Sequence, residues 1–190
     1  MTVMEKYEYL KSLVVSDRRE EFLKFMKWVE TETDYLSAPA STQYHLCREQ
    51  GLLEHSCNVA ATMIRLARTL DPEITDEQCV IVSLLHDLGK VGYPGQPQYI
   101  ENEPTDKQKM YGYKNKIPYK YNPDILYMPH SHRSIYLILP NFNLSQEECQ
   151  AILCHDGQYL QDNKSYAHKE SKLTVLLHYA DYYSCRFLED

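Results

Sequence analysis

The feature that most constrains the fold is the helical spacing of the apolar residues. Between Leu52 and Leu70 they recur every three or four positions, so that they lie on or near one face of a helix. A similar stripe follows Ser16-Asp17 and predicts N-terminal helices within residues 1–36. Only 6 of the 190 residues are glycine, and the short alternating runs typical of a β-sandwich or barrel are missing. The sequence therefore predicts an all-α fold.

Capping motifs and prolines indicate where further helices begin and end. Thr75-x-x-Gln78 and Ser145-x-x-Glu148 have the form of capping boxes, in which two side chains satisfy the free N–H groups at a helix start. Pro140 is expected to end a short helix over Ser131 to Leu139. The last helix is predicted from Lys169 to Leu188. Its stripe includes Leu173, Leu176, Leu177, Ala180 and Ser184.

One segment differs in composition from the helical remainder. The chain is expected to form one compact domain over residues 1–190, because 43% of it is hydrophobic and its length suits one core. Between Val91 and Pro129, however, lie five prolines and seven of the 17 tyrosines. Lys107 to Pro123 contains five lysines and no acid. Residues 91–129 are therefore expected to be an insert that acts as a lid, a partly ordered surface loop or a partner-binding arm.

Charge and hydropathy exclude several classes of protein. The sequence has no run of 18 apolar residues, and its first ten residues are too charged for a secretory signal, so we expect a cytoplasmic protein without a membrane partner. The six cysteines form no C-x-x-C pair, as is typical of reduced core thiols. A net charge of −7 argues against a duplex nucleic acid partner. The oligomeric state is left open.

A histidine and an aspartate stand together where burial would otherwise be costly. His86-Asp87 ends the very apolar stretch that includes Leu84 and Leu85, and a neutral imidazole beside a carboxylate suits a divalent cation. Polar residues interrupt apolar stripes elsewhere. They are His55, His130, His132, His155 and Asp181.

A lone buried histidine is more often structural than a ligand, but the joint pattern reverses that preference. His130 and His132 are two residues apart on a helix start and cannot both point the same way, so they are alternatives. His168 and His178 lie outside the pattern and are expected to be structural. Asp156, although it follows His155, is expected to cap or orient because Gly157 suggests a helix end.

These residues resemble a known family. Leu85 to Lys90 is similar to the signature of the HD-domain metal-dependent phosphohydrolases, and Gln50 to Ser56 resembles the entry helix of HD-type exoribonucleases, with Gln50 in place of a glycine. The His130 segment is similar to one in the dinuclear HD-GYP branch, and Tyr179 to Asp181 resembles the closing helix of bacterial HD endoribonucleases. The resemblance implies a single HD domain, a helical bundle interrupted by the insert.

The resemblance also implies a site and a reaction. One or two divalent ions (Mn, Fe, Mg, Ni, Co or Zn) are expected, with Asp87 as the bridging and central catalytic residue. Lys90, with Arg133 or His132, is expected to orient a phosphate. The implied reaction is hydrolysis of a phosphomonoester or phosphodiester by a metal-activated water. The expected metal ligands are His55, His86, Asp87, His130, His155 and Asp181.

The substrate class follows from the insert. Its tyrosines and lysines suit the bases and phosphates of a nucleotide or short oligonucleotide, so a phosphorylated small molecule or an oligonucleotide is the expected partner. Two alternatives remain open: an HD fold that binds nucleotides or proteins without catalysis, and a one-metal nucleotidase or triphosphohydrolase.

Overall fold

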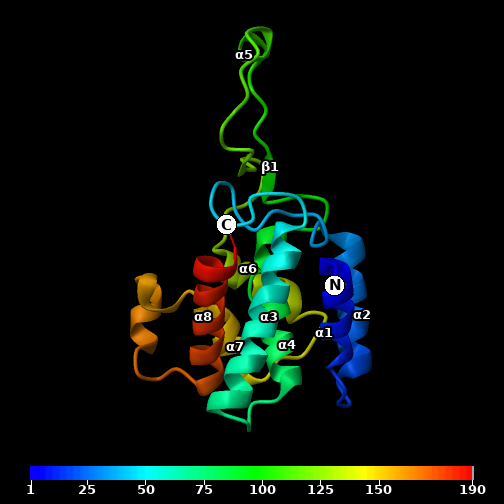
Figure 1. Ribbon diagram of the computed structural model, residues 1–190, viewed down its shortest axis with the longest axis vertical. Helices are drawn as coiled ribbons and strands as arrows, with labels where there is room; N and C mark the ends of the chain where they lie inside the picture. The colour runs from blue at the N-terminus through cyan, green and yellow to red at the C-terminus, as the bar shows by residue number, and fades with distance from the viewer. Residues whose placement is uncertain (190) are drawn as a thin grey trace.

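Helix α3 runs through the middle of a helical bundle and has neighbours on both sides (Figure 1). The computed structural model describes residues 1–189. Within this range no helix is long and apolar enough to cross a membrane. The body consists of α1 Val3–Ser12, α2 Arg19–Glu32, α3 Gly51–Leu70, α4 Asp76–Leu85, α6 His130–Ile138, α7 Gln146–Cys154 and α8 Lys172–Tyr183, with short 3₁₀ turns at Leu88–Val91, Gly157–Tyr159 and Asp162–Tyr166 and a π-helical turn at Ser184–Leu188.

The buried apolar side chains form one cluster that draws on every helix of the body. Tyr7 of α1 and Phe22 of α2 belong to it together with Leu52 of α3 and Leu177 of α8. The N-terminal helices are therefore part of the same core as the later ones. Tyr35, which is fully buried after α2, donates its hydroxyl to the carbonyl oxygen of Leu84 at the end of α4. The all-α prediction is confirmed.

Both predicted capping boxes are present. Thr75 and Gln78 cap α4 reciprocally, as do Ser145 and Glu148 at α7. The last helix begins later than predicted, at Lys172 rather than Lys169, because the Ser171 hydroxyl accepts the Thr174 N–H and fixes the start there.

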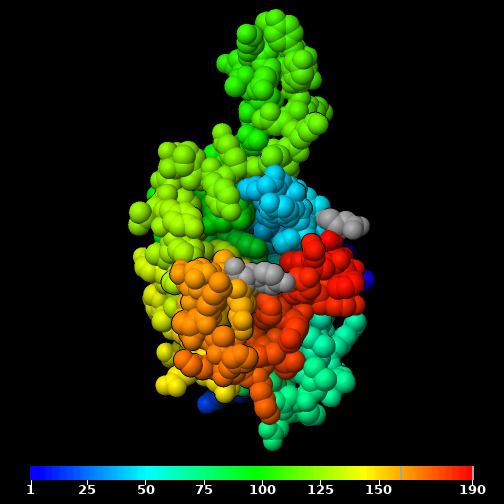
Figure 2. Space-filling model, turned by 90° about the vertical axis from the view of Figure 1, so that its left-hand side faces the viewer, coloured from blue at the N-terminus to red at the C-terminus, as the bar shows by residue number. Residues whose placement is uncertain are grey.

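The insert forms a long hairpin. Strands β1 (Tyr99–Glu101) and β2 (Tyr119–Tyr121) pair antiparallel, with Tyr99 opposite Tyr121, and the short helix α5 (Asp106–Met110) lies at the tip. The hairpin leaves one end of the bundle and its tip stands away from the body (Figure 1). Figure 2 shows the same narrow projection from the side. Strand pairing therefore gives the insert a regular base that sequence reasoning had not assigned.

Candidate metal centre

The His86-Asp87 pair lies at the end of α4, where the chain turns into the 3₁₀ segment Leu88–Val91. His86 is fully buried and Asp87 is 2% exposed. Ser134 of α6 holds this turn, because its hydroxyl accepts the Gly89 N–H at 2.8 Å and donates to the carbonyl oxygen of His86 at 2.8 Å. The start of α6, which carries His130, is thereby fastened beside the pair.

One carboxylate oxygen of Asp87 belongs to a first group of donor atoms. His55 Nε2 lies 3.4 Å from Asp87 Oδ2, 3.2 Å from His86 Nε2 and 3.2 Å from Asp181 Oδ1. His86 Nε2 is 3.5 Å from the same Asp87 oxygen. Helices α3, α4 and α8 thus each bring a side chain to one point.

The other oxygen of Asp87 belongs to a second group. His130 Nε2 lies 3.4 Å from Asp87 Oδ1 and 3.2 Å from His155 Nε2. Asp156 Oδ2 completes the group, 3.4 Å from His130 Nε2 and 3.8 Å from His155 Nε2. Asp87 therefore stands between the two groups and gives one oxygen to each.

The donor atoms fit divalent ions. Ligands about 2.0 to 2.2 Å from a shared ion lie roughly 3 to 3.5 Å apart, which matches most of these separations. Asp87 Oδ1 and Asp156 Oδ2 are buried without a hydrogen-bond partner, and such orphaned oxygens are costly unless a cation or proton satisfies them. Each group contains a set of side chains able to hold a metal ion.

Hydrogen bonds on the far side of the rings fix the tautomers that coordination needs. His86 Nδ1 lies 2.8 Å from the Ser83 carbonyl oxygen, and His155 Nδ1 lies 2.8 Å from that of Ile152. In the neutral ring Nδ1 must carry the proton to donate to a carbonyl, so Nε2 keeps its lone pair toward the donor groups.

The electrostatics of the centre are set by burial and by opposite charges at close range. Burial lowers the pKa of His86 to about 4, which keeps its ring neutral. Burial also opposes protonation of His155, but Asp156 and Asp87 outweigh it and raise the pKa of His155 to about 9. Burial alone would raise the pKa of Asp87, yet Lys90 and His86 hold it well below its usual value. In the absence of an ion the carboxylates are thus charged, and protons compete with metal for His155.

The three residues expected to orient a phosphate differ in their surroundings. Lys90 Nζ lies 2.5 Å from Asp87 Oδ2, and Lys90 lines a cavity beside the centre. His132 is exposed and lines the same cavity. Arg133 is 1% exposed, and its guanidinium bonds to the carbonyl oxygens of Gly89 at 2.8 Å and Met128 at 3.1 Å. Arg133 therefore fastens the base of the insert to the turn after Asp87, an arrangement that favours positioning over phosphate contact.

The cavity has a volume of about 970 Å³, and the base of the insert forms one wall of it. Tyr99, Tyr121 and Tyr127 line the cavity from that wall. Tyr44 and His45 line it from the loop between α2 and α3. The lysine-rich tip of the insert stands away from the body (Figure 1), and the cavity lining includes no residue between Tyr99 and Tyr121. Tyrosines of the insert therefore reach the cavity while its tip does not cover it.

Sequence reasoning missed two residues that contact the centre. Asp156 precedes the turn Gly157–Tyr159 but makes no side-chain capping bond there, and it joins the second donor group instead. The sequence did contain an indication of this role, because His155-Asp156 repeats the order of His86-Asp87. The second missed residue is Glu189, whose Oε2 lies 2.9 Å from His55 Nδ1. Nothing in the spacing of the sequence indicated this contact.

The two histidines expected to be structural lie outside both donor groups. His178 Nδ1 is 2.7 Å from the carbonyl oxygen of His155, so its ring supports the backbone of a donor residue. His168 is exposed and lines a smaller cavity of about 420 Å³ with Cys154 and His178.

The backbone at Gln50 explains why similar sequences have glycine at this position. Its φ is +62°, in the left-handed region where glycine is free of strain. The turn into α3 therefore has the same backbone conformation that glycine would favour, although glutamine tolerates it less well than glycine.

Comparison with known proteins gives one match. The stretch 52–185 matches the family model described as HD domain, and it includes every residue of the two donor groups. No curated protein and no solved structure matches the chain.

Proposed function

The chain belongs to the HD-domain family, and from this we propose that it is a metal-dependent phosphohydrolase that cleaves a phosphomonoester or phosphodiester of a nucleotide or short oligonucleotide. The observation that carries the proposal is the position of Asp87, whose two oxygens face two separate donor groups. The first ion would be held by His55, His86, Asp87 and Asp181, and the second by Asp87, His130, His155 and Asp156.

Ions bound there would lower the pKa of a bound water and neutralise the charge that develops on a phosphate. The protein's own residues then bind and orient the substrate. Lys90 brings an ammonium group to the cavity wall next to Asp87, where it can donate to a phosphate oxygen. His132 is exposed on the same wall and can contact the phosphate from the side of α6.

The nucleotide part of the proposal is supported by the aromatic wall of the cavity. Tyr99 and Tyr121 face each other across the hairpin with ring centroids 5.3 Å apart, and both line the cavity. Tyrosine rings of this kind stack on bases without strong sequence preference. A substrate with a base and a phosphate could therefore place the phosphate at Lys90 and the base at the hairpin.

The experiment that tests the proposal combines metal analysis with a panel of phosphomonoesters and phosphodiesters. We expect the two donor groups of purified protein to carry about two divalent ions, and the protein to hydrolyse at least one nucleotide substrate. Asp87→Asn should lose both properties, since it removes the shared carboxylate charge while keeping the side-chain shape. His168→Ala, at an exposed residue outside both groups, is the matched control and should keep both. A protein that binds nucleotides tightly but hydrolyses nothing would instead be a binding module.

A further inference from the structure

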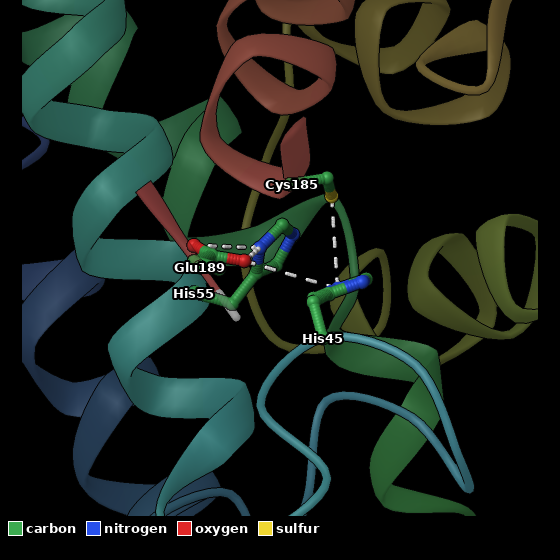
Figure 3. A group of neighbouring side chains, drawn as sticks. All are labelled: His45, His55, Cys185 and Glu189. Atoms are coloured by element: carbon green, nitrogen blue, oxygen red, sulfur yellow. Dashed lines mark hydrogen bonds and ion pairs between the residues drawn. The ribbon is translucent and has the colours of Figure 1, made fainter. Parts of the chain in front are cut away.

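A third group of metal-binding side chains lies beside the first donor group but shares no ligand atom with it. His45 comes from the loop between α2 and α3, Cys185 from the π-helical turn, and Glu189 from the residue after that turn. Figure 3 shows the three side chains converging next to His55. His55 turns Nε2 toward the first donor group and Nδ1 toward Glu189.

The separations suit one tetrahedral ion with a sulfur ligand. Cys185 Sγ lies 3.6 Å from His45 Nε2. With Zn–S about 2.3 Å and Zn–N about 2.0 Å, a tetrahedral zinc places these two atoms roughly 3.6 Å apart. His45 Nε2 and Glu189 Oε2 are 3.9 Å apart, so the His45 ring needs to approach by roughly half an ångström. All the donor atoms of the group lie within 4.8 Å of one another.

The carboxylate of Glu189 is held in place by hydrogen bonds and can still bind a metal ion. Its side chain is fully buried, Asn58 donates to Oε1 at 2.9 Å, and His55 Nδ1 lies 2.9 Å from Oε2. A carboxylate has about four lone-pair positions, so Oε2 can also accept a cation. Holding a histidine with one lone pair and a metal with another is a common use of a buried carboxylate.

We propose that His45, Cys185 and Glu189 form a separate zinc site, with a fourth ligand from solvent. The solvent position follows from His45, whose side chain is 19% exposed and lines the large cavity. A thiolate ligand favours zinc over hard ions such as magnesium or manganese, whereas the two Asp87 groups contain only imidazoles and carboxylates. Bound zinc would tie the His45 loop, which forms part of the cavity wall, to the segment that follows α8.

Without an ion the thiol of Cys185 would form only weak hydrogen bonds. Cys185 Sγ lies 3.5 Å from Asp181 Oδ1 as well as near His45, so a protonated thiol could donate to either. The two states differ in the protonation of sulfur, because a coordinating thiol loses its proton. A measurement that reports a metal–thiolate bond therefore separates them.

The test uses Co²⁺ as a spectroscopic substitute for zinc in the full chain. We expect a thiolate-to-cobalt charge-transfer band in the near ultraviolet, lost in Cys185→Ser and strongly reduced in His45→Ala. Cys47→Ser and Cys149→Ser remove cysteines of comparable exposure outside the group and should keep the band. Zinc content should fall by about one ion per chain in Cys185→Ser, with the other two ions retained. Circular dichroism of each variant verifies that it is folded.

The absence of the band in wild-type protein loaded with Co²⁺, or its persistence in Cys185→Ser, would overturn the proposal. The outcome is independent of the phosphohydrolase proposal. A protein that shows the band but hydrolyses no phosphoester keeps the zinc site and loses the proposed activity. An active protein without the band does the reverse.

Discussion

Gly89 packs so closely against His130 that a Cβ on Gly89 would lie 2.0 Å from the carbonyl oxygen of His130. The turn after Asp87 and the start of α6 therefore meet backbone to backbone. This contact holds His130 at the second donor group, since only a residue without a Cβ at position 89 leaves room for the two backbone segments.

We expect Gly89→Ala to force α6 away from the turn. Overpacking of this kind costs about 1 to 3 kcal/mol of unfolding free energy, and the displaced His130 should release the second ion. Urea denaturation of the metal-free protein and metal analysis of the loaded protein measure the two effects. Gly95→Ala is the control for metal binding: its added Cβ meets no atom within 4 Å, so it should release no ion, although its φ of +72° strains alanine and costs some stability. If Gly89→Ala retained two ions, the close contact would not be what positions His130.

The two donor groups should lose their ions separately. Asp156→Asn and His130→Ala each affect only the second group, so we expect the metal content of the two donor groups to fall from about two ions to about one. Asp181→Asn should remove the other ion. Asp87→Asn should remove both, as it belongs to both groups. Unchanged stoichiometry in both the His130 and Asp156 variants would favour the one-metal alternative.

The insert should act on substrate in two distinct ways. Tyr121→Ala changes a tyrosine that lines the cavity, and we expect it to raise KM for nucleotides with little change for a small generic phosphoester. Replacement of Lys114, Lys116 and Lys120 by serine changes the charge of the projecting segment. This variant should weaken oligonucleotide binding and flatten its salt dependence, while mononucleotide turnover is preserved.

Kinetics with three substrates of increasing length, at two salt concentrations, test the insert prediction. Equal effects of both variants on every substrate would indicate a structural or partner-binding role for the insert.

The Arg18–Glu148 ion pair should contribute to the stability of the bundle. Arg18 nitrogens lie 2.8 and 3.0 Å from the two carboxylate oxygens of Glu148, whose side chain is 1% exposed. Arg18→Met leaves that carboxylate buried without its cation, and we expect a loss of about 3 kcal/mol in unfolding free energy. Glu148→Gln in the same background should recover part of it. Arg65→Met, at an exposed position of α3, serves as the control for thermal or urea denaturation.

A pH-dependent contribution is expected from Glu77, which accepts hydrogen bonds from the Ser16 hydroxyl and from the N–H groups of Val15 and Ser16. Partial burial works to raise the pKa of Glu77, but these bonds outweigh it and hold the pKa below its usual value. The bonds therefore stabilise the fold above the unfolded-state pKa of about 4.3, and this contribution is lost as the pH falls through the folded-state pKa.

Urea denaturation of metal-free wild type and Glu77→Gln should reveal this dependence. We expect the variant to be less stable at about pH 7 and the difference to shrink at about pH 3, where Glu77 itself becomes neutral. A difference independent of pH would contradict the assignment.

The sequence predicted most of the helical core and the polar side chains that meet inside it. His55 and Asp181 interrupt apolar stripes, and a polar residue within such a stripe must face the interior. Asp156 was misjudged because it follows the end of α7, where backbone dihedrals rather than helical spacing decide its direction. Gly157 has a φ of +61° there. The direction of the Glu189 side chain is set in the same way by the π-helical turn before it. The hairpin could not be predicted because its two paired strands have three residues each, which is too short to show an alternating pattern.

The bonds from His86 Nδ1 to the Ser83 carbonyl and from His155 Nδ1 to the Ile152 carbonyl have a second consequence, because both histidines directly follow the last residue of a helix. The last carbonyl groups of a helix lack N–H partners in the next turn, and each ring supplies one. His86 and His155 are therefore helix C-caps as well as candidate ligands. Substituting either ring uncaps a helix even in metal-free protein, so the aspartates are the cleaner positions at which to separate metal binding from folding.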